Sequence, residues 1–211
     1  HTAKYNPQED QLVLLGDYVD RGKQNVGVLR TVAYLQSEGA IVLKGNHDNL
    51  CIYTIYEILN DCIGDCTEQH KLCGGPETYN ELIKLSSREL TQLFHFLYKL
   101  PLYYEIDNYI FVHAGINSDL PLEENDSNIL LWTRNEFIYV PAYKDKIVVF
   151  GHTVTYSLPH LIPEDGKILK KNVAVWFDDV NGGDKIGIDC GSIFGGKMAC
   201  LELPSNKVYY V

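Results

Sequence analysis

Short apolar runs, each closed by a cluster of small and polar residues, form the most regular pattern along this chain. The runs occupy residues 12–15, 41–43, 109–112 and 147–150. Apolar stretches of this length, rich in Val and Ile and bounded by glycine, predict buried strands. Open α/β sheets bind their ligands at the carboxyl ends of strands. We therefore expect functional side chains in the four clusters that come after these runs.

Helical spacing of apolar residues lies between some of these strands. Residues 26–35 predict an amphipathic helix that ends near Ser37, which would make a parallel strand–helix–strand unit with the first two strands. A second helix is expected from about Asn49. Ser86 precedes Glu89 by three residues, a capping-box pattern that predicts the start of a further helix.

The second half of the chain is rich in predicted strands. Residues 102–106 and 109–112 flank the turn pair Asp107 and Asn108 and predict a hairpin. Residues 185–189, 198–203 and 208–211 predict strands as well, and residues 60–75 resemble an insertion or a lid. We expect one α/β domain over residues 1–211.

Composition narrows the class of protein. The chain has 211 residues, of which 45% are hydrophobic and 22% charged, and its formal net charge is −10. This acidic balance argues against a duplex-binding protein, and no uncharged stretch reaches the roughly 18 residues of a membrane helix. We therefore expect no nucleic-acid partner and no membrane span.

The six cysteines are expected to be free thiols in a reducing cytoplasm, because no secretory signal opens the sequence. Cys62, Cys66, His70 and Cys73 have a spacing that could hold zinc, although it matches no common zinc module. Ordinary reduced cysteines are the favoured alternative, with His70, like His95 and His160, on the surface or in the core.

Four residues in the clusters carry the donor atoms of a metal site: Asp17, Asn46, His113 and His152. A carboxylate can bridge two cations, while Asn and neutral His each donate one further atom. Mixed oxygen and nitrogen donors suit manganese, iron or zinc. Two cations about 3.5–4 Å apart can activate a water for attack on phosphorus. For either histidine alone, a buried structural role is the competing interpretation.

Phosphoester cleavage also needs a proton donor and groups that bind the phosphoryl oxygens. His47 titrates in the right range, and Asp20 could hydrogen-bond it and favour its charged form. Arg21 and Arg134 are candidates for binding the phosphoryl oxygens. The alternative is that they form ion pairs on the surface. Asp48 either supports the site or caps the helix that begins there.

These motifs, GDYVDRG at 16–22, GNHD at 45–48, HAG at 113–115 and GHT at 151–153, resemble the phosphoprotein phosphatase family. This family of serine/threonine phosphatases belongs to the calcineurin-like metallophosphoesterases. Residues 131–134 and 188–197 also resemble family segments, the latter those of bacterial members. The resemblance implies a β-sandwich flanked by helices and two divalent cations, expected to be Mn²⁺, with Fe or Zn as alternatives.

The resemblance also implies roles for individual residues. Asp17 would bridge both metals, and Asn46, His113 and His152 would complete the second. His47 with Asp20 would be the acid pair, while Arg21 and Arg134 would hold phosphate. A metal-bound hydroxide would attack phosphorus directly, without a covalent phosphoenzyme.

One part of the family pattern has no match in this chain. The family opens with a strand that ends in Gly-Asp-x-His, whose Asp and His bind the first metal, and His1 is a weak candidate for its remnant. We expect a missing upstream segment, so that the first strand of the sheet is absent here. The alternative is a phosphate-binding module without turnover.

The expected reaction is hydrolysis of phosphomonoesters, with phosphoserine or phosphothreonine in proteins, or a small phosphoester, as the substrate. Symmetric hydrolases of dinucleoside tetraphosphates have similar motifs and are the alternative. In those enzymes the position of Asp20 typically holds a small residue, which favours the protein phosphatase interpretation.

Overall fold

The computed structural model describes residues 5–159, 174–179 and 181–211, and its chain divides into two compact units. We call Gln11–Leu102 the helical unit. His1–Asp10 together with Tyr103–Val211 form the sheet unit. A single catalytic domain over residues 1–211 stays a prediction. His1 and His160 lie outside the described residues.

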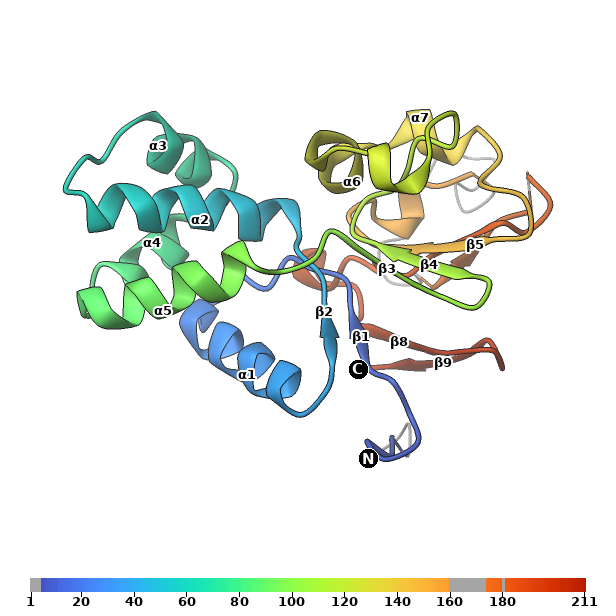
Figure 1. The fold of residues 1–211 in the computed structure, drawn as a ribbon, viewed down its shortest axis with the longest axis horizontal. Coiled ribbons are helices and arrows are strands. Elements are labelled where there is room, and N and C mark those ends of the chain that lie inside the picture. Colours follow the sequence, from blue (N-terminus) through green and yellow to red (C-terminus); the bar gives the residue numbers. More distant parts are fainter. Residues whose placement is uncertain (1–4, 160–173, 180) are drawn as a thin grey trace. The chain divides into compact units, whose positions relative to one another are not determined.

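The helical unit begins with the predicted strand–helix–strand arrangement. Strands β1 (Val13–Leu14) and β2 (Ile41–Val42) pair in parallel, and helix α1 (Asn25–Ser37) connects them. Four more helices come next: α2 (Asn46–Leu59), α3 (Asp65–Leu72), α4 (Pro76–Leu82) and α5 (Ser87–Tyr98). Figure 1 shows these helices gathered around α2.

Helix α5 confirms the capping box. The Ser86 side chain accepts a hydrogen bond from the backbone N of Glu89, and the Glu89 carboxylate accepts one from the backbone N of Ser86. The helix buries Leu90, Leu93 and Leu97, which join one apolar core with residues of α1, α2 and both short strands. This core holds α2, whose first turn carries predicted site residues.

The sheet unit is built on five strands in the order β3-β4-β5-β7-β6. The central strands β4, β5 and β7 pair in parallel with one another, whereas β3 and β6 pair antiparallel at the two edges. The bounds are β3 Tyr103–Ile106, β4 Tyr109–Val112, β5 Ile147–Phe150, β6 Trp176–Phe177 and β7 Lys185–Gly187. The predicted hairpin at Asp107 and Asn108 is confirmed.

Short helices and a second hairpin flank this sheet. Helices α6 (Ser127–Trp132) and α7 (Asn135–Ile138) lie on one side of it, and β8 (Ala199–Glu202) with β9 (Lys207–Tyr210) on the other (Figure 1). Helix α7 packs onto the sheet through Phe137, whose ring meets Phe150 edge-on at 5.2 Å between centroids. The fold is therefore mixed α/β, with a central sheet flanked by helices, as predicted.

One local expectation was wrong, and a second segment is better defined by the structure. Helix α2 begins at Asn46 rather than near Asn49, so the GNHD motif forms its first turn. Residues 60–75, expected to be an insertion or a lid, contain α3, which packs against α2 and buries Thr67 and His70. Within the described residues, no helix is both long enough and apolar enough to span a membrane.

Candidate metal centre and proton-donor network

The loop after β1 places the first group of predicted residues, and its backbone is unusual. Asp17, Asp20 and Arg21 have φ values of 61°, 78° and 60°, a left-handed conformation that non-glycine residues rarely adopt. Such strain persists only where surrounding contacts fix it. In this loop the fixing contacts come from α2, through Asp48, and from Asn25, Thr78 and Gly74, which bind the backbone N of Asp20 and of Arg21.

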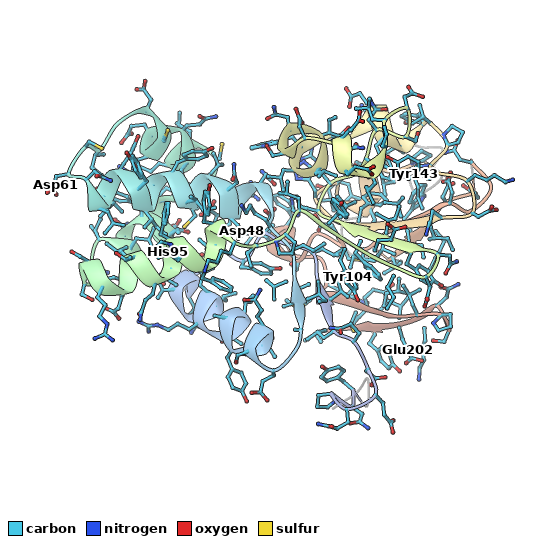
Figure 2. The ribbon with its side chains drawn as sticks, in the orientation of Figure 1. Asp48, Asp61, His95, Tyr104, Tyr143 and Glu202 are labelled. Carbon is cyan, nitrogen blue, oxygen red and sulfur yellow. The ribbon has the colours of Figure 1, made fainter. Side chains whose placement is uncertain are left out.

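Asp48 supplies the contacts from α2. Its buried carboxylate accepts hydrogen bonds from the backbone N of Asp17 at 2.8 Å, of Tyr18 at 2.9 Å and of Gly45 at 2.7 Å. Burial, together with the nearby charge of Asp17, raises the pKa of Asp48 to about 6. Asp48, labelled in Figure 2 at the start of α2, therefore ties the two loops together as well as capping the helix.

Asp17 and the first turn of α2 are in direct contact. The backbone N of His47 donates to Oδ1 of Asp17 at 3.0 Å, as expected for a carboxylate at a helix N-terminus. A β-carbon at Gly45 would overlap the backbone N and the carboxylate of Asp17, so only glycine allows this approach. Asn46 lies in this turn and is buried. The helical unit thus brings together two of the four predicted metal donors.

Asp20 is the centre of a buried hydrogen-bond network. Its Oδ2 lies 2.6 Å from Nδ1 of His47, which confirms the predicted hydrogen bond. Thr78 donates its hydroxyl to Oδ1 at 2.6 Å, and Nε2 of His70 lies 2.9 Å from both carboxylate oxygens. Only 1% of the Asp20 side chain is exposed.

The network shifts the titration of both members of the acid pair. Burial would raise the pKa of Asp20, but the hydrogen bonds from His47, His70 and Thr78 lower it to about 2. Burial would likewise lower the pKa of His47, but its hydrogen bond to Asp20 and the charges of Asp17 and Asp20 raise it. Asp20 is therefore a carboxylate at neutral pH, and His47 is stabilised in its protonated form.

Sequence reasoning missed His70 as a member of this network. It expected His70 on the surface or in the core without a partner, or beside Cys62, Cys66 and Cys73 as a zinc ligand. The structure uses both ring nitrogens otherwise, since Nδ1 lies 2.8 Å from Oγ1 of Thr54. His70 is therefore not available as the histidine ligand of the zinc site that was the alternative. Nothing in the local pattern indicates Asp20 as its partner, because 50 residues separate the two.

Arg21 is held against the segment after α3. Its backbone N donates to the carbonyl of Gly74 at 3.0 Å, and its Nη2 donates to the carbonyl of Cys73 at 3.1 Å. These contacts fix the loop next to Asp20. A phosphate-binding role for the Arg21 guanidinium stays a prediction.

The sheet unit carries the other two predicted metal donors at adjacent strand ends. His113 comes directly after β4 and His152 lies two residues beyond β5, and the backbone N of Gly151 donates to the carbonyl of His113 at 2.9 Å. Nε2 of His113 lies 3.2 Å from Nδ1 of His152. His152 has a φ of 60°, so a strained backbone turns this ring as well.

Arg134 lies beside this pair of histidines. Its Nη1 donates to the carbonyl of His152 at 2.9 Å and to Oγ1 of Thr153 at 3.2 Å. The ring of Trp132 meets the His152 ring edge-on at 6.2 Å. Trp132 and Arg134 therefore both contact the loop that bears His152. Phosphate binding by Arg134 stays a prediction.

The donor atoms fit a divalent cation. Metal–nitrogen bonds of about 2.0–2.1 Å at right-angled to tetrahedral geometry separate two imidazole nitrogens by about 2.9–3.4 Å. The 3.2 Å between the two ring nitrogens falls in this interval. Asp17 and Asn46 offer oxygen atoms, the complement that manganese, iron and zinc accept. Because the four donors belong to two units, their sharing of one centre stays a prediction.

The sequence matches the model of the calcineurin-like phosphoesterase family over residues 2–184. The match covers most of the chain, so the protein belongs to this family of metallophosphoesterases. The resemblance inferred from the four motifs is confirmed.

Curated relatives with two different activities match this chain. A symmetrical bis(5′-nucleosyl)-tetraphosphatase of Methylococcus capsulatus is 31% identical over 54% of this chain and 35% of its own length. Serine/threonine-protein phosphatase 1 of Salmonella typhimurium is 24% identical over 64% of this chain and 61% of its own. The chain thus spans about a third to three fifths of these relatives.

Solved structures support the fold. The crystal structure of a provisionally assigned diadenosine tetraphosphatase matches 99% of this chain and 83% of its own, with a TM-score of 0.66 at 19% identity. A metallophosphoesterase from Sphaerobacter thermophilus matches 96% of this chain and 77% of its own, with a TM-score of 0.51 at 22% identity. At such identities the likeness shows the fold alone.

Proposed function

We propose that this protein is a metal-dependent phosphatase that hydrolyses phosphomonoesters, with phosphoserine or phosphothreonine in proteins as its substrate class. The observation that carries the proposal is the buried acid pair, His47 and Asp20, joined by a 2.6 Å hydrogen bond beside Asp17. Family membership and the relative that is a serine/threonine phosphatase support it.

Two divalent cations, proposed to be Mn²⁺, would bind Asp17, Asn46, His113 and His152 and would supply Lewis acidity and an activated water. The chain's own residues hold and orient the ester. The guanidinium groups of Arg21 and Arg134 would bind phosphoryl oxygens bidentately.

The leaving group explains why an acid pair is needed. Cleavage of a serine phosphate breaks the phosphorus–oxygen bond and releases an alkoxide, which is strongly basic. His47 uses Nδ1 to donate to Asp20, so Nε2 is the atom that would give its proton to the departing oxygen. Asp20, a carboxylate at neutral pH, keeps the ring in this tautomer and stabilises the charged imidazolium.

Symmetric hydrolysis of a dinucleoside tetraphosphate is the second candidate, favoured by relatives such as the Methylococcus capsulatus enzyme. That reaction expels a nucleoside diphosphate, whose terminal phosphate has a pKa of about 6 and leaves without a strong acid. The buried His47–Asp20 pair therefore favours the phosphomonoester.

The test compares a phosphoserine peptide with diadenosine tetraphosphate, in the wild type and in His47→Ala, with added Mn²⁺. We expect higher kcat/KM for the phosphopeptide and a loss of about 10²–10⁴-fold on it in the variant, the usual contribution of general acid catalysis. p-Nitrophenyl phosphate, with its good leaving group, should lose much less. Faster turnover of the tetraphosphate, little affected by His47→Ala, would contradict the proposal.

We further propose that the protein acts in the cytoplasm. All six cysteines are free in the structure, and thiols persist in a reducing compartment.

A further inference from the structure

His70 is a buried imidazole to which no predicted role applies. Its side chain is 0% exposed, and each ring nitrogen has a partner, Asp20 on one side and Thr54 on the other. Burying a polar ring so completely is costly unless its hydrogen bonds are made. The packing of α3 against α2 makes both of them.

We propose that His70 is a positioning residue, which holds the Asp20 carboxylate in the orientation that fixes His47 as the proton donor. The proposal rests on the proposed phosphomonoesterase function, since it assigns a part of that site. It adds a second imidazole to the acid pair, contributed by α3.

The hydrogen bonds of Asp20 show how His70 acts. Oδ2 faces His47 and His70, whereas Oδ1 faces His70 and Thr78. A carboxylate that accepts from one imidazole can still turn about its terminal torsion, which is broad. Because Nε2 of His70 lies 2.9 Å from both oxygens, it opposes this rotation together with the Thr78 hydroxyl on Oδ1 and keeps Oδ2 aligned with His47.

Helix α2 connects both ends of this arrangement. His47 and Thr54 are seven residues apart on it, a spacing that places them on one helix face two turns apart. His47 is hydrogen-bonded to Asp20 directly. Thr54 is hydrogen-bonded to His70, which in turn is hydrogen-bonded to Asp20. The carboxylate is therefore held from two points of one rigid element.

The chain after α3 leaves space for this ring. A β-carbon at Gly75 would lie 2.6 Å from Cδ2 and 2.7 Å from Nε2 of His70, closer than real contacts allow. Position 75 therefore accommodates glycine because the imidazole occupies the adjoining volume. The segment expected to be an insertion or a lid therefore packs around the His70 ring.

The first measurement uses His70→Leu, which keeps apolar bulk and removes both hydrogen bonds. We expect kcat on a phosphoserine peptide to fall about tenfold, a part of the acid contribution of about 10²–10⁴, while p-nitrophenyl phosphate changes less than twofold. His70→Gln keeps an N–H near the place of Nε2 and should restore most of the lost rate. Equal losses on both substrates in a folded His70→Leu would overturn the proposal.

A double-mutant cycle tests whether His70 acts through His47. In a His47→Ala background, His70→Leu should no longer alter the ratio of rates on the two substrates. If it still lowers the phosphopeptide rate tenfold, His70 acts by another route and the proposal fails. Thr54→Val, which leaves the ring in place but removes its hydroxyl partner, is the milder variant if His70→Leu does not fold.

A measurement without turnover separates this proposal from the proposed function. In metal-free protein, proton NMR should show a downfield imidazole N–H resonance that His47→Ala abolishes, the sign of the short bond to Asp20. We expect His70→Leu to broaden it through faster exchange with water, and His70→Gln to retain it. An unchanged resonance would overturn the positioning role. Absence of phosphatase activity with this response intact would refute only the proposed function.

Discussion

The two units hold their site residues in different ways. In the helical unit, Asp20 accepts hydrogen bonds from two imidazoles and one hydroxyl, all from the same unit. In the sheet unit, the nitrogens of His113 and His152 face each other at 3.2 Å. In the helical unit, hydrogen-bond donors surround the Asp20 carboxylate. In the sheet unit, two imidazole nitrogens lie next to each other.

This difference matches the two roles that we propose, proton donation in the helical unit and metal binding in the sheet unit. A carboxylate with several donors is complete without any added ion, because each donor has an acceptor. Two imidazole nitrogens at this distance can share one proton, or both can bind one cation through their lone pairs. The helical unit thus forms its network from protein atoms, while the sheet unit presents two nitrogens that we propose as metal ligands. The comparison predicts that removing cations affects the two units unequally.

Chelation should give the largest effect. We expect removal of bound metal to lower phosphopeptide hydrolysis by about 10³-fold or more, because the water nucleophile loses its activation. The ring signals of His113 and His152 should shift in NMR spectra, while the N–H signals of His47 and His70 stay in place. Mn²⁺ added back should restore the rate. The NMR comparison uses protein loaded with diamagnetic Zn²⁺, because Mn²⁺ broadens nearby ring signals. Loss of the His47 signal on chelation would show that the network also depends on metal, which would break the comparison.

The sequence predicted a large part of this arrangement, for physical reasons. Residues next to strand ends could be read from local pattern, because a short apolar run fixes where a strand stops and which side chains lie just beyond its end. The Asp20–His47 hydrogen bond could be predicted because both residues lie in short motifs that resemble those of the phosphoprotein phosphatase family. His70 could not be predicted, because its contact with Asp20 depends on how α3 packs against α2.

Helix boundaries show the same limit. Asn46 begins α2 although the apolar periodicity starts later, since the first turn is fixed by bonds to Asp17 and Asp48 rather than by core packing. Strand β6 has two residues, too few for any periodicity. Such elements are determined by tertiary contacts, which a single sequence does not display.

The pH dependence gives a second, smaller effect that sharpens the comparison. His47 must be protonated to donate, and its pKa is raised because its hydrogen bond to Asp20 and the charges of Asp17 and Asp20 outweigh burial. Phosphopeptide hydrolysis should therefore be retained above pH 6.5, the usual pKa of histidine. Above the raised pKa of His47, the rate of phosphopeptide hydrolysis should fall about tenfold per pH unit.

Asp20→Asn supplies the control for this profile. It removes the charge next to His47 and should move the alkaline limb of kcat toward lower pH. Hydrolysis of p-nitrophenyl phosphate depends little on the acid. Its kcat should therefore fall less steeply at alkaline pH in the same protein. If the limb of the wild type lies below pH 6.5, or does not respond to Asp20→Asn, the proton-donor role of His47 is wrong.

The smallest effect comes from two glycines, one beside each group of donors. At Gly45 a β-carbon would overlap the backbone N of Asp17, whereas at Gly115 it would approach the Phe137 ring at 2.5 Å and the Thr133 methyl at 2.8 Å. Overpacking typically costs about 1–3 kcal/mol of unfolding free energy. We expect the cost of Gly45→Ala to lie near the upper end of this range, because backbone atoms cannot move away as easily as a side chain can.

The paired variants also separate stability from metal binding. Gly45→Ala should weaken Mn²⁺ binding measured by calorimetry, because the displaced atoms belong to Asp17. Gly115→Ala should lower the melting temperature by several degrees and leave Mn²⁺ affinity close to that of the wild type, since Phe137 packs on the sheet through Phe150. The opposite ranking, with affinity lost only in Gly115→Ala, would mean that Asp17 is not a metal ligand and that the helical unit contributes proton chemistry alone.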